Sequence, residues 1–357
     1  MTTPPWLSRS RSASHHKHVQ RTLQQRESRR AFIRYLYLKE LAPPKSISRQ
    51  LLDHYSIAIG CNPDNGNKNR YGDIMPYDRT LVVVDPLGTQ RYLNASWCLE
   101  QFGRKWWIAS QATLPATAHA FLSLIRQPIT LPGTTQTTQG RSQQPNRVKT
   151  VVQLTQIVEG GRRKAHSYFP TKVGRSIVHY PEPGSSATAL RVTLLQVVDI
   201  ADACCVKSTV SVTEENREED PVTFQHLLYT AWPDRGVPEP DDQKSLIAFL
   251  RLVDTTNRPA PGDPDLPAIV GCSAGIGRTG TFIAISSLLR HEGYLTAAAS
   301  PHSSQSVSSP PLGPLPSAFD EDLVAREVDS LREQRPGMVQ QASQLELIYS
   351  LLEAALV

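Results

Sequence analysis

Residues 266–281 read LPAIVGCSAGIGRTGT, an apolar run followed by small residues and the start of a second apolar run. The run ending at Val270 predicts a strand, and TGTFIAISSLLR at Thr279–Arg290 predicts a helix. Between them lie Cys272 and Arg278, separated by five residues of which three are glycine or alanine. The stretch therefore predicts a strand, a tight loop and a helix, with a thiol and a guanidinium at the two ends of the loop.

Such a loop suits an anion. Small residues let successive backbone N–H groups turn inward as a nest for negative charge, and the N-terminus of the following helix adds its positive end. The same field favours the thiolate form of a cysteine. Arg278 offers a planar fork that fits two phosphate oxygens, and the Thr279 hydroxyl is a candidate hydrogen-bond partner of the sulfur. Taken alone, the stretch equally fits a glycine-rich turn beside an incidental buried cysteine.

The core of this stretch, VGCSAGIGRTG (residues 270–280), resembles the signature loop of protein tyrosine phosphatases, which usually carries histidine where this chain has Gly271. Six further motifs resemble the family's other loops and follow in the family's order. They are NRYGDI (69–74), YLNAS (92–96), IASQATLP (108–115), VEGGRRK (158–164), AWPDRGVP (231–238) and PGMVQQASQ (336–344). The resemblance covers about residues 60 to 350, and we expect a phosphatase of the non-receptor type.

The resemblance implies an α/β fold in one domain, with a highly twisted mixed sheet flanked by helices. Hydrophobic periodicity is compatible with it. Strands are expected at Leu81–Val84, Val151–Leu154 and Leu190–Val198, and helices around residues 246–253, 324–331 and 345–356.

The domain is expected to occupy residues 31–357, after a disordered basic tail over residues 1–30. Two low-complexity insertions interrupt it, at about residues 128–147 (rich in Thr, Gln and Pro) and 296–319 (rich in Ser and Pro). Neither has enough apolar surface to offset its ordering entropy, so both are expected to be mobile surface excursions.

The resemblance also implies a two-step mechanism. The Cys272 thiolate attacks phosphorus, Asp234 protonates the leaving tyrosyl oxygen, and Gln340 positions the water that hydrolyses the cysteinyl-phosphate. Arg278 and the loop amides hold the phosphate oxygens, and Glu159 braces Arg278. The implied substrate-binding residues are Tyr71, Asp73, Ser273, Ala274, Gly275, Ile276, Gly277 and Gln344. The implied supporting residues are Glu159, Lys164, Thr279 and Trp232. Neither a metal ion nor a cofactor is expected.

Some of these assignments depend on the whole set of motifs. Asp234 alone equally fits a turn aspartate, and Tyr71 alone would more often be a half-buried core aromatic. Because Gly271 replaces the usual histidine, a phosphotyrosine-binding module with attenuated turnover is the alternative to a working enzyme. A histidine at this position is expected to raise the rate if the surrounding packing accepts it. A sulfurtransferase is a weaker alternative, since it leaves the Trp-Pro-Asp and Asn-Arg-Tyr motifs unexplained.

The composition of the 357 residues excludes several other classes. The five cysteines are odd in number and scattered, which favours free thiols in a reducing compartment over a disulfide framework. The net charge is +5, without a basic stripe interleaved with aromatics, so nucleic-acid binding is not expected. No apolar run is long enough to predict a membrane span. We expect a cytoplasmic protein acting on phosphotyrosine-containing proteins, with mitochondrial targeting by the N-terminus as a minor alternative.

Overall fold

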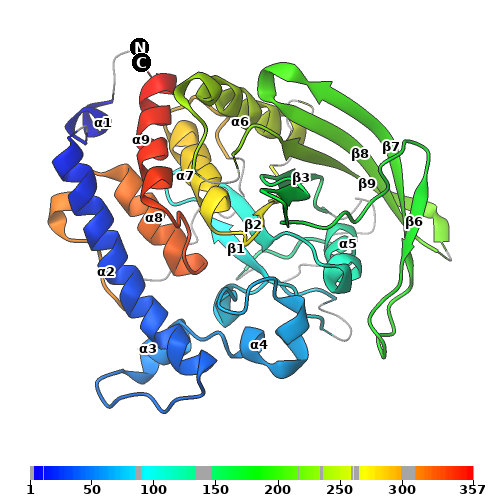
Figure 1. Cartoon of the computed structure of the whole chain (residues 1–357), viewed down its shortest axis with the longest axis horizontal. Helices are drawn as coiled ribbons and strands as arrows, with labels where there is room; N and C mark the ends of the chain where they lie inside the picture. Colours follow the sequence, from blue (N-terminus) through cyan, green and yellow to red (C-terminus); the bar gives the residue numbers. More distant parts are fainter. Residues whose placement is uncertain are drawn as a thin grey trace, which may run out of the picture.

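A computed structural model describes residues 4–10, 12–85, 90–132, 146–215, 217–233, 236–258, 260, 265–298 and 310–356. A twisted eight-stranded sheet runs through the molecule in the order β1-β2-β10-β3-β9-β8-β7-β6 (Figure 1). Its strands are β1 (Ala95–Leu99), β2 (Trp106–Gln111), β3 (Thr150–Gln153), β6 (Ser176–His179), β7 (Leu190–Ile200), β8 (Cys205–Glu214), β9 (Arg217–Tyr229) and β10 (Ala268–Cys272). A separate hairpin pairs β4 (Val158–Glu159) with β5 (Arg162–Arg163).

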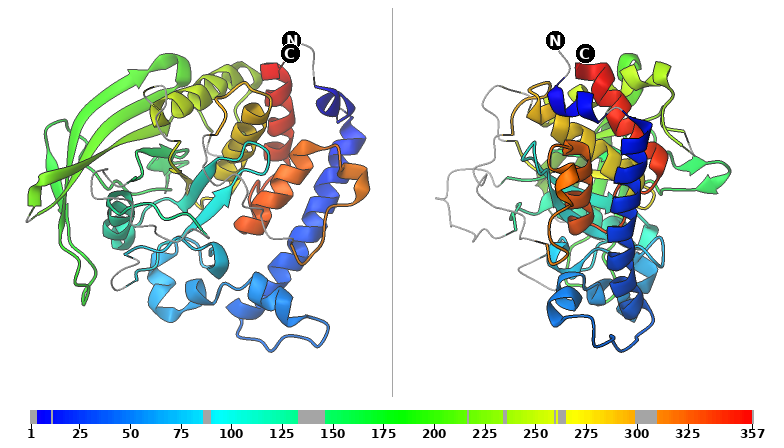
Figure 2. Two further views of the ribbon diagram at one scale, coloured as in Figure 1. Left: turned by 180° about the vertical axis from the view of Figure 1, so that it is seen from behind. Right: turned by 90° about the vertical axis from the view of Figure 1, so that its left-hand side faces the viewer.

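Helices cover both faces of this sheet. The described α-helices are α1 (Pro5–Arg9), α2 (Ala13–Leu38), α3 (Arg49–His54), α4 (Ala58–Cys61), α5 (Ala118–Arg126), α6 (Gln243–Asn257), α7 (Gly277–His291), α8 (Leu323–Gln334) and α9 (Ala342–Leu356). One hydrophobic core joins the sheet to α6, α7, α8 and α9, and a second core joins its other face to α5 (Figures 1 and 2). The expected mixed sheet flanked by helices is therefore confirmed.

The centre of the sheet is parallel and its flanks are antiparallel. β10 runs parallel to both β2 and β3, and β3 runs parallel to β9. Parallel strands covered on both faces are built from nearly continuous apolar residues, which explains the run of Ala268, Ile269 and Val270 in β10. Ligands of open α/β sheets bind at the carboxyl ends of such strands, and Cys272 is the last residue of β10.

Most of the elements expected from periodicity are present. β3 and β7 begin within one residue of the expected strands, and α6, α8 and α9 contain the expected helical stretches. The strand expected at Leu81–Val84 is wrong. This segment makes only two isolated bridges, Leu81 with Ser96 and Val84 with Arg91, so it crosses the sheet edge without joining it.

The disordered tail expected over residues 1–30 is also wrong for the part that the structure describes. α1 and α2 run beside α8 and α9 (Figures 1 and 2). Val19 and Leu23 of α2 are buried in the main core. Arg30 is fully buried as well, and its guanidinium pairs with Asp329 and Glu333 of α8. These contacts bind the N-terminal helix to the domain.

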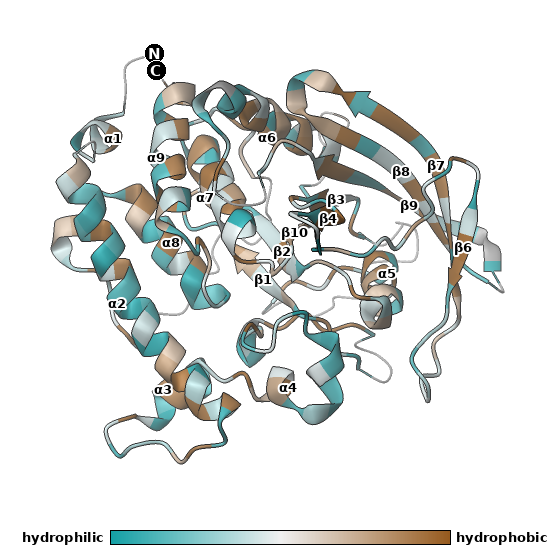
Figure 3. Ribbon diagram, in the orientation of Figure 1, coloured by the Kyte–Doolittle hydropathy of each residue, from teal (hydrophilic) through white to brown (hydrophobic). Residues whose placement is uncertain are grey.

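The composition of α2 explains why periodicity missed it. Its buried stripe continues through Glu27 and Arg30 before reaching Ile33 and Leu36. Two polar residues therefore stand where an amphipathic pattern requires apolar ones, and the helix is hydrophilic over most of its length (Figure 3).

Parts of the expected insertions lie outside the described residues, namely 133–145 of the first and 299–309 of the second. The described end of the second is packed rather than mobile. Arg26 of α2 donates to the carbonyls of Leu312, Gly313 and Pro314, and Phe319 is buried in the main core. Among the described helices, none combines the length and apolar character needed to cross a bilayer.

Candidate active site

The loop between β10 and α7, residues 272–278, is called the cysteine loop below. Its path requires glycine at Gly275, where φ is +72° and a Cβ atom would overlap the backbone of Ser110. Within the described residues, no protein group accepts a hydrogen bond from the amides of 273–277. These amides precede the first full turn of α7, so they form the concave donor nest expected from the sequence.

A buried arginine holds the cysteine loop from behind. Arg335 donates from Nε to the Gly275 carbonyl at 2.7 Å and from Nη2 to the Ala274 carbonyl at 3.1 Å. Its other bonds go to Ser96 Oγ at 3.1 Å and Asn94 Oδ1 at 2.8 Å. Burial lowers the pKa of the Arg335 guanidinium from its ordinary value, against the opposing charges of groups that include Cys272. The loop carbonyls are thus turned toward a positive charge that also attracts an anion held at the nest.

Arg278 begins α7 and is gripped by a carboxylate. Its Nη1 lies 2.7 Å from Glu159 Oε1 and its Nη2 lies 2.9 Å from Glu159 Oε2, which makes a two-pronged ion pair. The same guanidinium donates to the carbonyls of Leu154 at 2.8 Å and Pro233 at 2.9 Å. Glu159 is 8% exposed and Arg278 9% exposed, so water screens the pair little. The brace expected for Arg278 is present.

Tyr71 forms one wall above the cysteine loop. Its hydroxyl lies 2.8 Å from Ser273 Oγ, and Ser273 Oγ donates to the Lys164 carbonyl at 2.9 Å. The Tyr71 segment is fixed from below, because Gln111 accepts from the Arg70 amide at 2.9 Å. Tyr71 nevertheless stays 37% exposed, which leaves its ring open to a ligand.

A cavity of about 290 Å³ opens over the cysteine loop. It gathers most of the predicted side chains in one place. Its lining residues are Tyr71, Asp73, Ile74, Glu159, Lys164, Gly236, Cys272, Ser273, Ala274, Gly277, Arg278, Gln340, Gln341 and Gln344. Gln340 and Gln344 lie on the α7 side, where a Cβ atom added at Gly277 would meet the Gln344 amide at 2.9 Å.

The other predicted residues are not among the residues that line this cavity. Gly275 and Ile276 shape the loop from beneath, and Ile276 is buried in the core. Trp232 is also buried, and its indole donates to the Gly236 carbonyl at 3.3 Å. Asp234 and its neighbour Arg235 lie outside the described residues.

Thr279 does not make the hydrogen bond expected from the sequence. Its side chain is fully buried, and its Oγ1 has no hydrogen-bond partner among the described residues, Cys272 included. As the third residue of α7, it is carried into the helix and its hydroxyl does not reach the sulfur.

The structure accounts for glycine at position 271. Gly271 pairs with Ser110 of β2, and a Cβ atom added to it would lie 2.7 Å from the Ser110 carbonyl oxygen. That separation is shorter than real Cβ contacts, so a histidine here would push β10 away from β2. The packing condition attached to the expected benefit of Gly271→His is therefore not met in this structure.

Sequence reasoning missed Arg335, Gln111 and Asn94 as positioning residues. Arg335 directly precedes the PGMVQQASQ motif, and Gln111 and Asn94 lie inside quoted motifs. Their positions were visible, but their roles depend on distances between loops that are far apart in sequence.

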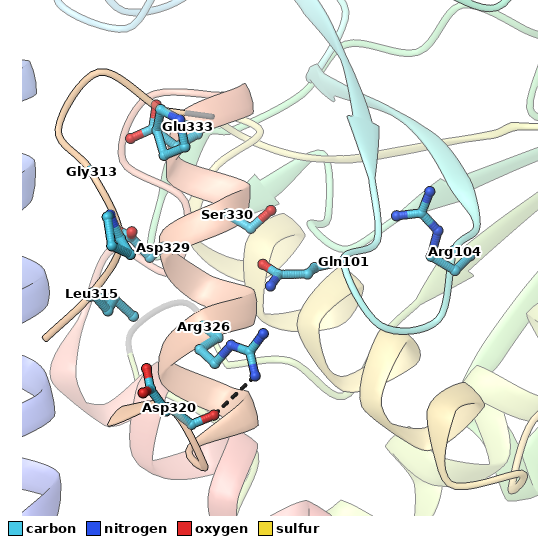
Figure 4. Close-up of a pocket in the computed structure, with 11 residues that line it drawn as sticks. Gln101, Arg104, Gly313, Leu315, Asp320, Arg326, Asp329, Ser330 and Glu333 are labelled. Carbon is cyan, nitrogen blue, oxygen red and sulfur yellow. Dashed lines mark hydrogen bonds between the residues drawn. The ribbon is translucent and has the colours of Figure 1, made fainter. Parts of the chain in front are cut away.

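A larger cavity of about 460 Å³ lies on the far side of α8, between that helix and residues 310–315 (Figure 4). Two of its three acids are already paired, because Asp329 and Glu333 bind Arg30. Arg326 points toward Asp320 and donates to its carbonyl at 3.0 Å (Figure 4). The residues that line this cavity include no cysteine and no histidine. Across the described ranges there is also no cluster of three or more His, Cys, Asp or Glu side chains able to hold a metal ion.

Comparison with known proteins agrees with this geometry. The family model described as "Protein-tyrosine phosphatase" matches residues 65–129 and 143–297. Receptor-type tyrosine-protein phosphatase eta of Mus musculus is 32% identical over 228 residues, covering 63% of this chain and 16% of the relative. Receptor-type tyrosine-protein phosphatase S of Gallus gallus is 32% identical over 235 residues, covering 64% and 13%. Receptor-type tyrosine-protein phosphatase zeta of Rattus norvegicus is 31% identical over 241 residues, covering 65% and 9%.

The matched region is thus a small part of each of these relatives. "Receptor-type" is said of them, so the non-receptor type expected for this chain stays a prediction.

Proposed function

This chain belongs to the protein-tyrosine phosphatase family, and on that basis we propose that it hydrolyses phosphotyrosine in proteins with Cys272 as the nucleophile. The observation that carries the proposal is the cysteine loop itself. Cys272 lies at the floor of a cavity, next to a nest of uncommitted amides and the braced guanidinium of Arg278. That arrangement supplies fixed positive charge for a phosphate dianion without a metal ion.

The first step is phosphoryl transfer to sulfur. The Cys272 thiolate attacks phosphorus and forms an S–P bond, while the bond from phosphorus to the tyrosyl oxygen breaks. Asp234 gives its proton to that oxygen, so neutral tyrosine leaves. Arg278 and the loop amides hold the three remaining oxygens, and because Glu159 fixes the guanidinium plane, little reorganisation is needed as charge moves.

The second step returns the enzyme to its starting state. Water oriented by Gln340, with Gln344 beside it, attacks phosphorus and gives its proton to the Asp234 carboxylate. The S–P bond breaks, its electron pair returns to Cys272, and inorganic phosphate leaves.

Tyr71 supports specificity for phosphotyrosine. Its ring rises beside Ser273 at the cavity mouth, so the phosphate must reach past it to meet Cys272. A phosphotyrosine side chain is long enough and presents an aromatic face to the Tyr71 ring, whereas phosphoserine and phosphothreonine are shorter.

Attenuated turnover, the alternative suggested by Gly271, gains no support from the geometry. The close approach of Ser110 accounts for the glycine, and Arg335 fixes the cysteine loop from behind.

The test is Cys272→Ser in the full chain. Turnover of p-nitrophenyl phosphate should disappear, while a phosphotyrosine peptide still binds because the nest and Arg278 remain. Cys204→Ser is the matched control, since Cys204 directly precedes β8 and does not line the cavity. Retention of most activity by Cys272→Ser would sink the mechanism. Binding without any turnover by the natural protein would favour the binding module.

A further inference from the structure

Arg332, near the end of α8, ties three segments of the chain together. Its Nε donates to the Met338 carbonyl and its Nη2 to the Val339 carbonyl, each at 2.8 Å. Its Nη1 donates to the Leu23 carbonyl of α2 at 3.0 Å. The side chain is 7% exposed. Each arm of the guanidinium therefore ends on a backbone carbonyl, two of them immediately before Gln340.

Val339 is held in an unfavourable backbone conformation. Its φ is +55°, the left-handed region that β-branched residues avoid. Such strain costs about 1–3 kcal/mol and persists only where the surroundings enforce it. The Val339 amide donates to the Ile276 carbonyl of the cysteine loop at 3.2 Å. A Cβ atom added at Gly280 of α7 would lie 2.5 Å from the Val339 nitrogen, so the two backbones are in close contact.

The strained residue therefore has a clamp on each side. Ile276 and Gly280 limit its movement toward the cysteine loop, and Arg332 holds its carbonyl from α8. The next residue is Gln340, whose side chain lines the catalytic cavity. Any relaxation of Val339 toward an ordinary φ would rotate the peptide that carries Gln340.

α2 completes this clamp. Without the Leu23 carbonyl, one arm of the Arg332 guanidinium would be buried without an acceptor. Arg26 and Arg30 fix the register of α2 on α8 through Asp329, three residues before Arg332. Helix α2 is therefore linked through Arg332 to the segment that carries Gln340.

We propose that Arg332 is a positioning residue for Gln340, anchored by α2, and that it acts on the second half of the reaction. This rests on the proposed function, in which Gln340 orients the water that attacks the cysteinyl-phosphate. Formation of that intermediate depends on Cys272 and Arg278, which Arg335 and Glu159 hold independently of Arg332. Loss of the clamp should therefore slow hydrolysis of the intermediate and leave its formation intact.

The experiment is pre-steady-state kinetics of Arg332→Lys in the full chain with p-nitrophenyl phosphate. Lysine keeps the charge but cannot reach three carbonyls with a planar fork. A displacement on the order of 1 Å costs up to about 10²-fold in rate. We expect kcat to fall by roughly 10- to 100-fold with kcat/KM unchanged, and a burst of p-nitrophenol equal to the enzyme concentration.

Arg326→Lys is the matched control. Arg326 lies on the same helix but lines the larger cavity beside residues 310–315 (Figure 4) and is not among the residues that line the catalytic cavity. Its kcat should equal that of the natural protein, and its burst of p-nitrophenol should be no larger. Val339→Gly is a second variant, because glycine adopts φ +55° without strain and so loosens Gln340 with Arg332 in place. It should reproduce the selective loss of kcat.

The outcomes separate the two proposals. A parallel fall of kcat and kcat/KM with a reduced burst would show that Arg332 only maintains the folded fraction, and an unchanged kcat would show that Gln340 needs no clamp. Either result overturns the inference and leaves the proposed function standing. If the natural protein, used in excess over p-nitrophenyl phosphate, releases no p-nitrophenol in a single turnover, the proposed function fails, and the inference fails with it.

Discussion

The guanidinium of Arg278 contacts two segments that are far apart in sequence, the Glu159 hairpin and the segment that ends at Pro233. Glu159 occupies one edge of it, and the carbonyl of Pro233, the residue before Asp234, accepts from Nη2 at 2.9 Å. The backbone directly before Asp234 is therefore bonded to Arg278, the proposed phosphate-binding residue. In the proposed mechanism, Arg278 would thus couple phosphate binding to the segment that leads to Asp234.

Asp234→Ala should slow hydrolysis of a phosphotyrosine peptide by roughly 10²–10⁴-fold, the usual contribution of a positioned general acid. The loss should be much smaller for p-nitrophenyl phosphate, because nitrophenolate leaves without a proton. The measurement is kcat/KM across a series of aryl phosphates of graded leaving-group acidity. The same loss for every leaving group would give Asp234 a different role.

Gly271→Ala should destabilise the protein, although alanine usually stabilises a strand interior relative to glycine. The added Cβ would lie 2.7 Å from the Ser110 carbonyl in the middle of the sheet, and such overpacking costs about 1–3 kcal/mol. Gly66→Ala is the control, since nothing lies within 4 Å of the Cβ it would add. Urea unfolding should show a lower midpoint for Gly271→Ala alone. Equal midpoints would mean that β2 and β10 separate easily, and that histidine is tolerated there.

At the scale of elements, the strand, loop and helix that carry the site could be predicted because each has a recognisable local sequence pattern. β10, the cysteine loop and α7 follow one another within 24 residues, and the small residues of the loop specify its conformation locally. Arg335 and Thr279 show the limit. Arg335 donates to the carbonyl of Gly275, which is 60 positions away in sequence. The Thr279 hydroxyl was expected to bond the sulfur of Cys272 because the two residues are close in sequence, but it is buried without a hydrogen-bond partner among the described residues. Roles that depend on the packing of distant segments are not encoded in a motif.

The segment from Asn69 to Ile74 provides a prediction at this scale. The Asn69 side chain donates to the Gly60 carbonyl, and Gln111 accepts from the Arg70 amide. These two bonds fix the segment that carries Tyr71. Tyr71→Ala should lower kcat/KM for a phosphotyrosine peptide by about 3- to 10-fold, the worth of one aromatic pair. The substitution should also reduce the ratio of kcat/KM for the phosphotyrosine peptide to kcat/KM for the matched phosphoserine peptide. Tyr180→Ala, at a tyrosine 72% exposed on the surface, is the control. Comparable rates of the natural protein on both peptides would instead indicate dual specificity.

At the scale of the whole molecule, the N-terminal helix is held by buried charge rather than by apolar packing alone. Arg30 meets Asp329 and Glu333 of α8, and Tyr55 also donates to Glu333, at 2.9 Å. A buried ion cluster adds little stability over apolar residues, but removing one member leaves an uncompensated charge. The cluster therefore specifies where α2 docks, and through Arg332 that position bears on Gln340.

The pH dependence of stability should report this cluster. Burial alone would raise the pKa of the Glu333 carboxyl from its ordinary 4.5, but the bonds from His54 and the charge of Arg30 outweigh burial and lower it to about 2. A carboxyl with a depressed folded-state pKa contributes its full stabilisation above its unfolded value. That contribution is lost as the pH falls from about 4.5 through about 2. At 1.36 kcal/mol per pKa unit it amounts to about 3 kcal/mol.

Glu333→Gln should therefore lower the free energy of unfolding by about 3 kcal/mol at pH 7, and its deficit should vanish near pH 2. The measurement is urea unfolding of both proteins at several pH values between 7 and 2. Glu346→Gln, at an exposed position of α9, is the control and should follow the natural protein throughout. A deficit that stays constant down to pH 2 would mean that Glu333 stabilises the junction by its shape and hydrogen bonds. In that case the negative charge of Glu333 would not be what docks α2.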